Sequence, residues 1–405
     1  MWKTRPSSLT SLYPKINRSK LTQCYINDGQ KAGAHGDKLS SCPFACLRVC
    51  QWNIQYFKPP TAEFFGDNDL EHVRKLVKTL LGADADVIVL NEFGERGRDG
   101  GCSEVFEFCR LMERAGYEIY SEALVYYPTA VLVRRGTRSS NVRRCNMSDI
   151  QVVSGTEYKL DDVRSVVHVQ LQFQMLCCVE RGGNKGLSSN GCLETNLGQQ
   201  LPSTSSTSPY VMKNVCLDIF GTHLDHIDAP HYMKRLSEAQ SLMSVIDSVN
   251  QQRTLNLRRN NKDECIYCSL IAGDFNQQRC DDYSSLEWKW ICENKLKRHS
   301  PTSDGVSDLL KENNFVCNFD QISRSTNCGK ENENRQNFKT SNKLVECNWI
   351  KTDPPPATHW SGTVIDYTYT RGPIHLRKIQ ISPSNLSDHR LVVCDWSISM
   401  SVMGS

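Results

Sequence analysis

A short apolar run, Val87–Leu90, ends directly at two polar residues, Asn91 and Glu92. A run this short and this uniformly apolar is typical of a strand that is buried on both faces of its sheet. Such a strand requires a layer of structure on each side, which favours a layered α/β protein. Because the polar pair follows at once, the end of this strand is a place where a loop can carry reactive groups.

The rest of the chain continues this pattern of strands and helices. Alternating and short apolar runs predict strands at 47–54, 87–90, 129–134, 166–175, 215–221, 268–272, 364–370 and 391–396. Helical periodicity predicts helices at 68–81, 103–115, 234–250 and 303–314, with Gly82 and Gly116 ending the first two. We therefore predict an α/β (α+β) fold, a four-layer α/β/β/α sandwich of two packed mixed sheets flanked by helices.

Composition divides the chain into one domain and its flanks. Residues 46–397 are predicted to form the domain, with polar insertions near 181–209 and 321–346. Residues 398–405 are expected to fray. The 1–45 segment has several basic residues and serines and few acids. That composition fits a mitochondrial transit peptide as well as an unstructured tail, and we favour the tail.

Charge and cysteine content narrow the classes of function. Lys and Arg number 48 against 45 Asp and Glu, a net charge of +3, so phosphate recognition must be local rather than a matter of bulk charge. No apolar run approaches the roughly 18 residues of a membrane-spanning helix. The 19 cysteines are scattered, and no secretory signal accompanies them. We therefore expect an intracellular protein in a reducing compartment, the cytoplasm or nucleus.

Polar motifs recur where the predicted strands end. Each brings a carboxylate, an amide or an imidazole to the same kind of position. The residues are Asn53, Glu92, His223, Asp274, Asn276, Asp366, Asp388 and His389. Taken alone, each has an ordinary interpretation as a turn, a helix cap or a solvated loop residue. Together and in this order they favour one site, and we expect them to converge in a single pocket.

Three of these side chains are suited to holding a metal ion. A hard cation such as Mg²⁺ neutralises a phosphate and prefers carboxylate, amide-oxygen and water ligands. Glu92 and Asp388 can supply carboxylates, and Asn53 can supply an amide oxygen. These residues therefore predict a Mg²⁺ cofactor, with Mn²⁺ as a substitute.

The other side chains are suited to moving protons and stabilising charge. Asp274 can orient a water and accept its proton, and Asn276 can orient that carboxylate or donate to a phosphate oxygen. The imidazoles of His223 and His389 can donate to the charge that develops on the phosphate or the leaving oxygen. An imidazole in this role is usually oriented by a carboxylate, for which Asp366 is the candidate. The set as a whole favours hydrolysis of a phosphate ester.

The ordered motifs resemble the signature of the endonuclease/exonuclease/phosphatase superfamily, which has the DNase I-like fold, over about residues 46–397. By that resemblance Asn53 is the asparagine of the first strand, which holds the phosphate or the metal shell. Glu92 is the principal metal ligand, and Asp388 is a carboxylate on the metal side. The resemblance thus implies a metal-dependent hydrolase, whether nuclease, phosphodiesterase or phosphatase.

The resemblance also implies catalytic roles. His223 matches a histidine that several members direct toward the phosphate or leaving group. Asp274 and Asn276 match an Asp-x-Asn pair that positions the water and the phosphate. Asp366 matches the aspartate that pairs with the final histidine, His389. Members differ in which group is the general base, so that assignment stays open here.

Two positions depart from the pattern of the superfamily. Asn91 stands where glutamine usually precedes the metal-binding glutamate, a change of one methylene in an amide beside the site. His223 stands where apurinic endonucleases have tyrosine, which disfavours that specialised activity.

The substrate is less constrained than the chemistry. Arg96, Trp360 and Arg371 lie close to the motifs in sequence, and we predict that they bind substrate, although ordinary packing explains them equally well. Nucleic acid is the leading substrate, cleaved by a monomeric nuclease or DNA-end-processing phosphodiesterase. The alternatives are an inositol-phosphate or sphingolipid-type phosphoesterase on the same fold, and a non-catalytic interaction module.

Overall fold

The computed structural model of the protein describes residues 46–57, 69–94, 103–121, 127–135, 150–178, 210–226, 232–260, 265–283, 285–294, 305–321, 357–359, 363–382 and 386–398. The predicted tail at 1–45 lies outside the described residues. So do the polar insertion at 181–209 and nearly all of that at 321–346.

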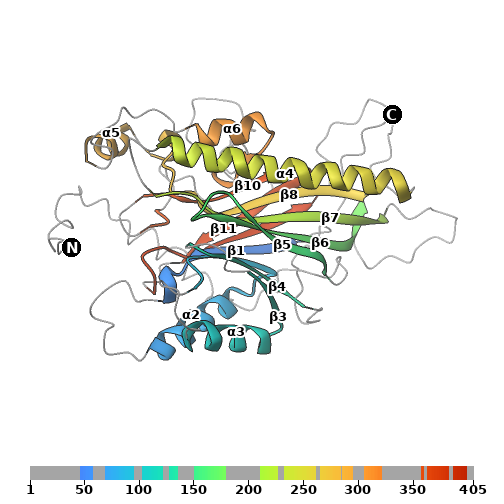
Figure 1. Ribbon diagram of the computed structural model, residues 1–405, viewed down its shortest axis with the longest axis horizontal. Coiled ribbons are helices and arrows are strands. Elements are labelled where there is room, and N and C mark those ends of the chain that lie inside the picture. Colours follow the sequence, from blue (N-terminus) through green and yellow to red (C-terminus); the bar gives the residue numbers. More distant parts are fainter. Residues whose placement is uncertain are drawn as a thin grey trace, which may run out of the picture. The chain divides into compact units, whose positions relative to one another are not determined.

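Two mixed six-stranded sheets form the centre of the described domain (Figure 1). The first sheet has the order β11 (Ile374–Ile381), β12 (Val392–Ile398), β1 (Cys46–Asn53), β2 (Val87–Asn91), β4 (Thr129–Arg134), β3 (Tyr117–Tyr120). The second has the order β5 (Gln151–Lys159), β6 (Ser165–Cys178), β7 (Tyr210–His223), β8 (Cys265–Asp274), β10 (Asp366–Arg371), β9 (Val316–Cys317). Within each sheet one central pair is parallel, β1 with β2 and β7 with β8, and the other pairs are antiparallel.

Helices cover the outer face of each sheet. Helices α2 (Asp69–Ala83) and α3 (Ser103–Arg114) lie on the first sheet, and α4 (Tyr232–Asn260), α5 (Ser285–Asn294) and α6 (Val306–Glu312) lie on the side of the second (Figure 1). Short 3-10 turns, η3 (Gln55–Phe57) and η6 (Cys280–Asp282), follow β1 and β8. The predicted four-layer α/β/β/α sandwich is confirmed. Among the described helices, none is long and apolar enough to cross a membrane.

The pattern of strand β1 shows how the sequence builds these layers. Leu47 and Val49 belong to the core between the sheets, whereas Cys50 and Trp52 belong to the core beneath α2 and α3. This alternation directs every second side chain to the same face. Asn53 therefore lies on the side of the inter-sheet core, and it is buried there.

Two amides of the first sheet tie it to the backbone of the second at one end of the sandwich. The Asn91 side chain donates to the Thr222 carbonyl over 2.8 Å and accepts from the Asp274 amide over 2.9 Å. The Gln51 carbonyl oxygen accepts from the Gly273 amide over 3.0 Å. A buried amide left without partners costs free energy, so these bonds fix how the two sheets meet. Asn91, the departure from the superfamily pattern, is thus a link between the sheets.

Most predicted elements are present, with differences at their ends. Gly82 does not end its helix, because α2 continues to Ala83 and Asp84 takes the left-handed conformation instead (φ 52°). Aspartate tolerates that conformation, and the Asp84 carboxylate is paired with Arg134. Gly116 does follow α3 with a positive φ of 88°, as predicted. Helix α4 is longer than predicted at both ends, and α6 is shorter.

Gly273 is a position where the fold requires glycine, and Gly82 provides a matched control. A Cβ atom on Gly273 would lie 1.8 Å from the Thr222 carbonyl oxygen, and its φ is +150°. We expect Gly273→Ala to lower the free energy of unfolding by at least about 2 kcal/mol. Gly82, inside α2 with open space around it, should gain about 0.5–1 kcal/mol when changed to alanine. Urea unfolding of both variants tests this, and wild-type stability for Gly273→Ala would contradict the close approach.

Candidate active site

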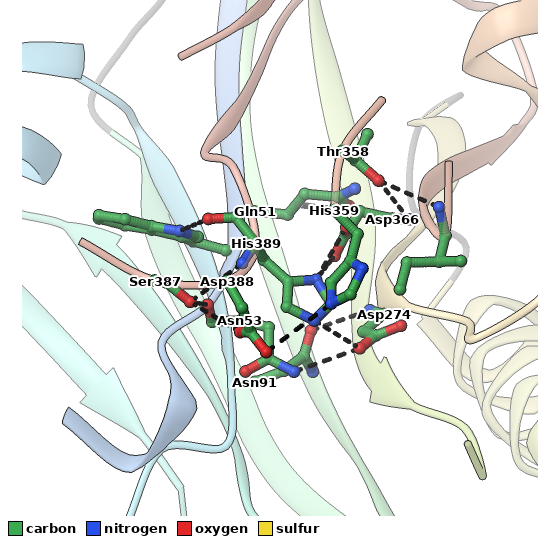
Figure 2. A network of polar contacts seen from close by, with 12 residues as sticks. Gln51, Asn53, Asn91, Asp274, Thr358, His359, Asp366, Ser387, Asp388 and His389 are labelled. Atoms are coloured by element: carbon green, nitrogen blue, oxygen red, sulfur yellow. Dashed lines mark hydrogen bonds and ion pairs between the residues drawn. The ribbon is translucent and has the colours of Figure 1, made fainter. Parts of the chain in front are cut away.

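The predicted site residues meet where the two sheets are tied together. Asn53 and Asn91 are register partners at the ends of β1 and β2, and His223 and Asp274 are register partners at the ends of β7 and β8. Asp366, the first residue of β10, lies opposite Asp274. Ends of parallel strands from both sheets thus bring their polar side chains to one place (Figure 2).

Asp274 is the centre of this cluster. Its carboxylate is 3.2 Å from the Asn53 amide nitrogen, 3.5 Å from His389 Nε2 and 3.6 Å from His223 Nε2. The backbone amide of Asn276 donates to its other oxygen over 2.8 Å. All of these side chains except Asn276 are buried. Four groups therefore hold the carboxylate. They come from the end of β1, the end of β7, the loop after β8 and the loop before β12.

Asn53 joins two carboxylates. Its amide nitrogen donates to Glu92 Oε1 and to Asp274 Oδ2, each over 3.2 Å, while its oxygen accepts from the Gln55 amide over 3.0 Å. The nitrogen, and not the oxygen predicted to hold a metal, therefore faces the acids. Glu92 itself is half-buried and has a positive φ of 53°, so the turn after β2 carries it toward Asn53.

His389 and Asp366 form a buried pair, the pairing that the resemblance implied. His389 Nδ1 lies 3.0 Å from the Asp366 carboxylate. The loop that carries His389 is tied to β1, because Trp52 Nε1 donates to the His389 carbonyl over 2.9 Å. Although burial opposes it, the carboxylates of Asp366 and Asp274 raise the pKa of His389 to about 10. The two carboxylates therefore favour the protonated form of this imidazole.

The surroundings of His223, in contrast to those of His389, favour the neutral form of the imidazole. Burial, helped by the nearby charge of Arg164, holds the pKa of His223 well below its usual value. Its Nδ1 atom is buried and has no hydrogen-bond partner among the described residues. Its ring meets that of Tyr127 edge to face, with 5.7 Å between ring centres. The surroundings thus favour the neutral form of His223 and the protonated form of His389, and both imidazoles lie near Asp274.

Burial shifts the pKa of two acids of the site upward. It raises the pKa of Glu92 and raises that of Asp274 to about 7. Both shifts mean that the ionised forms of these two carboxylates are disfavoured. Although burial opposes it, the hydrogen bond from His359 lowers the pKa of Asp388. Two sets of side chains have ligand atoms close enough together to hold a metal ion. One set is Asp274, Asp366 and His389, and the other is His359, Asp388 and His389. A divalent cation fits this arrangement, because it supplies the missing positive charge.

Arg164 is a member of the site that the motifs did not indicate. Its side chain is fully buried, and its guanidinium lies 3.8 Å from the centre of the Tyr127 ring. Nη2 is 3.2 Å from His226 Nδ1, whereas Nε and Nη1 have no hydrogen-bond partner among the described residues. Its charge lowers the pKa of Glu92, although burial raises that pKa more. The only sequence signal was an arginine directly before the regular strand at 166–175.

The remaining predicted residues are placed less directly. Asp388 is half-buried and acts electrostatically on Glu92, and the Asn276 side chain donates to the Leu224 carbonyl over 3.0 Å. Arg371 and Asp366 lie at the two ends of β10, about 16 Å apart along the extended strand. The Arg371 guanidinium lies over the ring of Phe315. The structure therefore does not bring Arg371 to the cluster. Arg96 and Trp360 lie outside the described residues.

Comparison with known proteins gives likeness in structure only. No protein-family model matches the chain, and no curated protein matches it. Solved structures that match include an endonuclease/exonuclease/phosphatase from Beutenbergia cavernae DSM 12333, 14% identical with a TM-score of 0.46, over 88% of this chain and 72% of that one. Another is D. rerio TDP2 complexed with single strand DNA product, 12% identical with a TM-score of 0.40, over 87% and 99%. A third is the endonuclease/exonuclease/phosphatase from Bacteroides vulgatus. It is 10% identical with a TM-score of 0.45, over 87% of this chain and 99% of that one.

The burial of Arg164 generates a prediction about stability. A buried cation with unsatisfied donors costs free energy, so Arg164→Met should raise the free energy of unfolding by about 1 kcal/mol or more. Arg48 is the control, because it is a largely buried arginine whose guanidinium is paired with Asp395 at 2.5 and 2.8 Å. Arg48→Met should lower the free energy of unfolding by about 1–3 kcal/mol. Chemical denaturation measures both, and destabilisation by Arg164→Met would show that the arginine is part of the framework.

Proposed function

We propose that this protein is a divalent-metal-dependent phosphoesterase that hydrolyses phosphodiester bonds, with nucleic acid as the leading substrate. The observation that carries the proposal is the buried Asp274 carboxylate, held at once by an amide, two imidazoles and a backbone N–H group. Such an arrangement has no evident use in a binding module, because burying this many acids costs free energy.

The proposed cofactor is Mg²⁺, with Mn²⁺ as a substitute. Glu92 and Asp388 would hold it, since both are half-buried carboxylates and Asp388 acts electrostatically on Glu92. When bound, the ion would neutralise the phosphate and stabilise the charge that develops during hydrolysis. Asn53 would position Glu92 and Asp274 through its amide nitrogen, a role that differs from the ligand role predicted from sequence.

Asp274 is the candidate to orient a water and accept its proton. Its pKa of about 7 lies near neutral pH, where a general base works best. The backbone N–H group of Asn276 and the side-chain amide of Asn53 fix the direction of the Asp274 carboxylate, so little reorganisation is needed for proton transfer. The water would then attack the phosphorus atom in line with the leaving oxygen, from the side where Asp274 lies.

The two imidazoles and Arg164 would serve the phosphate. His389, kept cationic by Asp366 and Asp274, can donate to a phosphate oxygen through Nε2. The unpartnered donors of the Arg164 guanidinium can do the same. His223, which is neutral, is suited to donating a hydrogen bond to the leaving oxygen without adding another charge.

The charge of the site favours a phosphodiester over a polyphosphorylated head group. Arg164 and His389 are the cations that lower the pKa of Glu92, and a phosphodiester carries one negative charge. An inositol polyphosphate carries several and would require a larger cluster of basic side chains. Nucleic acid therefore stays the leading substrate, and a sphingolipid head group is the competing diester.

An Asp274→Asn variant tests the proposed reaction, with Asp395→Asn as the control for loss of a buried carboxylate outside the site. We expect Asp274→Asn to lower kcat by about 10²–10⁴-fold, because asparagine cannot accept the proton. Asp395→Asn should keep the wild-type rate once both proteins are confirmed to be folded. The assay uses Mg²⁺ with single-stranded DNA, RNA, tyrosyl-linked DNA, inositol phosphates and sphingomyelin.

Three results of that assay would contradict the proposal. Unchanged turnover by Asp274→Asn would exclude it as the group that activates water. Equal hydrolysis with and without EDTA would exclude the metal-dependent mechanism. Cleavage of inositol phosphates or sphingomyelin in preference to nucleic acid would replace the leading substrate by one of the alternatives.

A further inference from the structure

A third histidine, His359, lies beside the catalytic cluster, and the proposed reaction gives it no role. Its Nε2 atom is 3.7 Å from Asp388 Oδ2, and its ring centre is 4.8 Å from that of His389. The side chains of His359 and Asp388 are 18% and 24% exposed, so both can be reached from solvent. One carboxylate oxygen and two imidazole nitrogens thus lie within 4.8 Å of one another (Figure 2).

The backbone holds these side chains in place. His359 and His389 form an isolated antiparallel bridge, and the Arg390 amide donates to the Thr358 carbonyl over 2.7 Å. The His359 amide donates to the Thr363 carbonyl over 3.0 Å. The segments that carry the two imidazoles are therefore joined directly, and a ligand that needs both would not have to bring them together.

The ligand chemistry of this group differs from that of a Mg²⁺ site. Mg²⁺ prefers oxygen ligands, whereas imidazole nitrogen suits zinc and other first-row transition ions. Ligands of a tetrahedral zinc ion stand about 3.3 Å apart, given Zn–N distances of about 2.0 Å, and the His359–Asp388 distance is close to that. Zinc-binding histidines usually donate their other ring N–H to a carboxylate, and His389 Nδ1 is 3.0 Å from Asp366.

We propose that His359, Asp388 and His389 form a site for a transition-metal ion such as Zn²⁺, and that this ion inhibits the enzyme. Zn²⁺ binding would release the Nε2 proton of His389 to solvent, because only a deprotonated imidazole nitrogen binds a metal ion. The inhibition rests on the proposed function, because the site takes Asp388 from the Mg²⁺ ion and His389 Nε2 from the phosphate. Zn²⁺ and a productive Mg²⁺–substrate complex therefore exclude each other. His359 adds the nitrogen ligand that makes the competing site complete.

The test is a calorimetric titration of Zn²⁺ into the full-length protein with Mg²⁺ in excess. His359→Ala should weaken Zn²⁺ binding by about tenfold or more. The matched control is His375→Ala, which removes an exposed histidine of β11 and should leave the zinc affinity unchanged. His359→Asn is the second variant, in case the alanine protein does not fold. Bound Co²⁺ reports the same site through the intensity of its visible absorption, which should fall in the His359 variants.

Inhibition is measured as the ratio of activity with Zn²⁺ to activity without it, separately for each protein. We expect this ratio to be low for the wild type and for His375→Ala, and closer to one for the His359 variants. Equal zinc affinity in wild type and His359→Ala would overturn the site, and tight zinc binding without inhibition would overturn the inhibitory role. If the wild type hydrolyses no phosphodiester, the proposed function fails, whereas the calorimetric comparison still decides whether the site exists.

Discussion

The bonds from Gln51 and Asn91 to the backbone of β7 and β8 determine where everything else in the site can lie. They join the two sheets at the end where β1, β2, β7 and β8 terminate. Apolar packing between the sheets is not directional, whereas these bonds favour one arrangement. Because they fix the Gly273–Asp274 peptide against the first sheet, Asp274 meets Asn53 at hydrogen-bond distance. The close approach also explains why residue 273 is glycine.

The cost of this arrangement is a concentration of acids that are buried or half-buried. Glu92, Asp274 and Asp366 come from three different segments, and burial raises the pKa of the first two. The amide of Asn53 and the charge of His389 offset part of this cost but not all of it. Strongly perturbed ionisable groups of this kind cluster at functional sites more than elsewhere. This concentration of acids supports the proposal that the site binds a cation.

How much the sequence could predict depended on position in the sheets. Central strands such as β2 and β6 are buried in a regular pattern, and their apolar runs predicted them. The strands that were missed, β3, β5, β9 and β11, are the four edges of the two sheets. An edge strand is partly exposed, as β5 shows, so its side chains carry no clear alternation. Helix α5 was missed as well.

Position in the sheets also decided which residues of the site could be predicted from the sequence. Residues that end central strands, such as Asn53, Glu92 and Asp274, could be found because a strand pattern stops at a polar residue. Arg164 and His359 could not, because their importance lies in what the fold places beside them. Proximity in sequence was a poor guide for Arg371, which is carried to the far end of β10. Its placement follows from strand geometry that only the assembled sheet reveals.

The proposed function requires that the acids at the end of the sandwich form a site for a divalent cation. Thermal unfolding with and without Mg²⁺ tests this requirement, because a ligand that binds only the folded state raises its stability. We expect Mg²⁺ to raise the Tm of the wild type and to raise it much less for Glu92→Gln, which keeps the hydrogen bond to Asn53 but lacks the charge. An equal response of the two proteins, or none in the wild type, would contradict it.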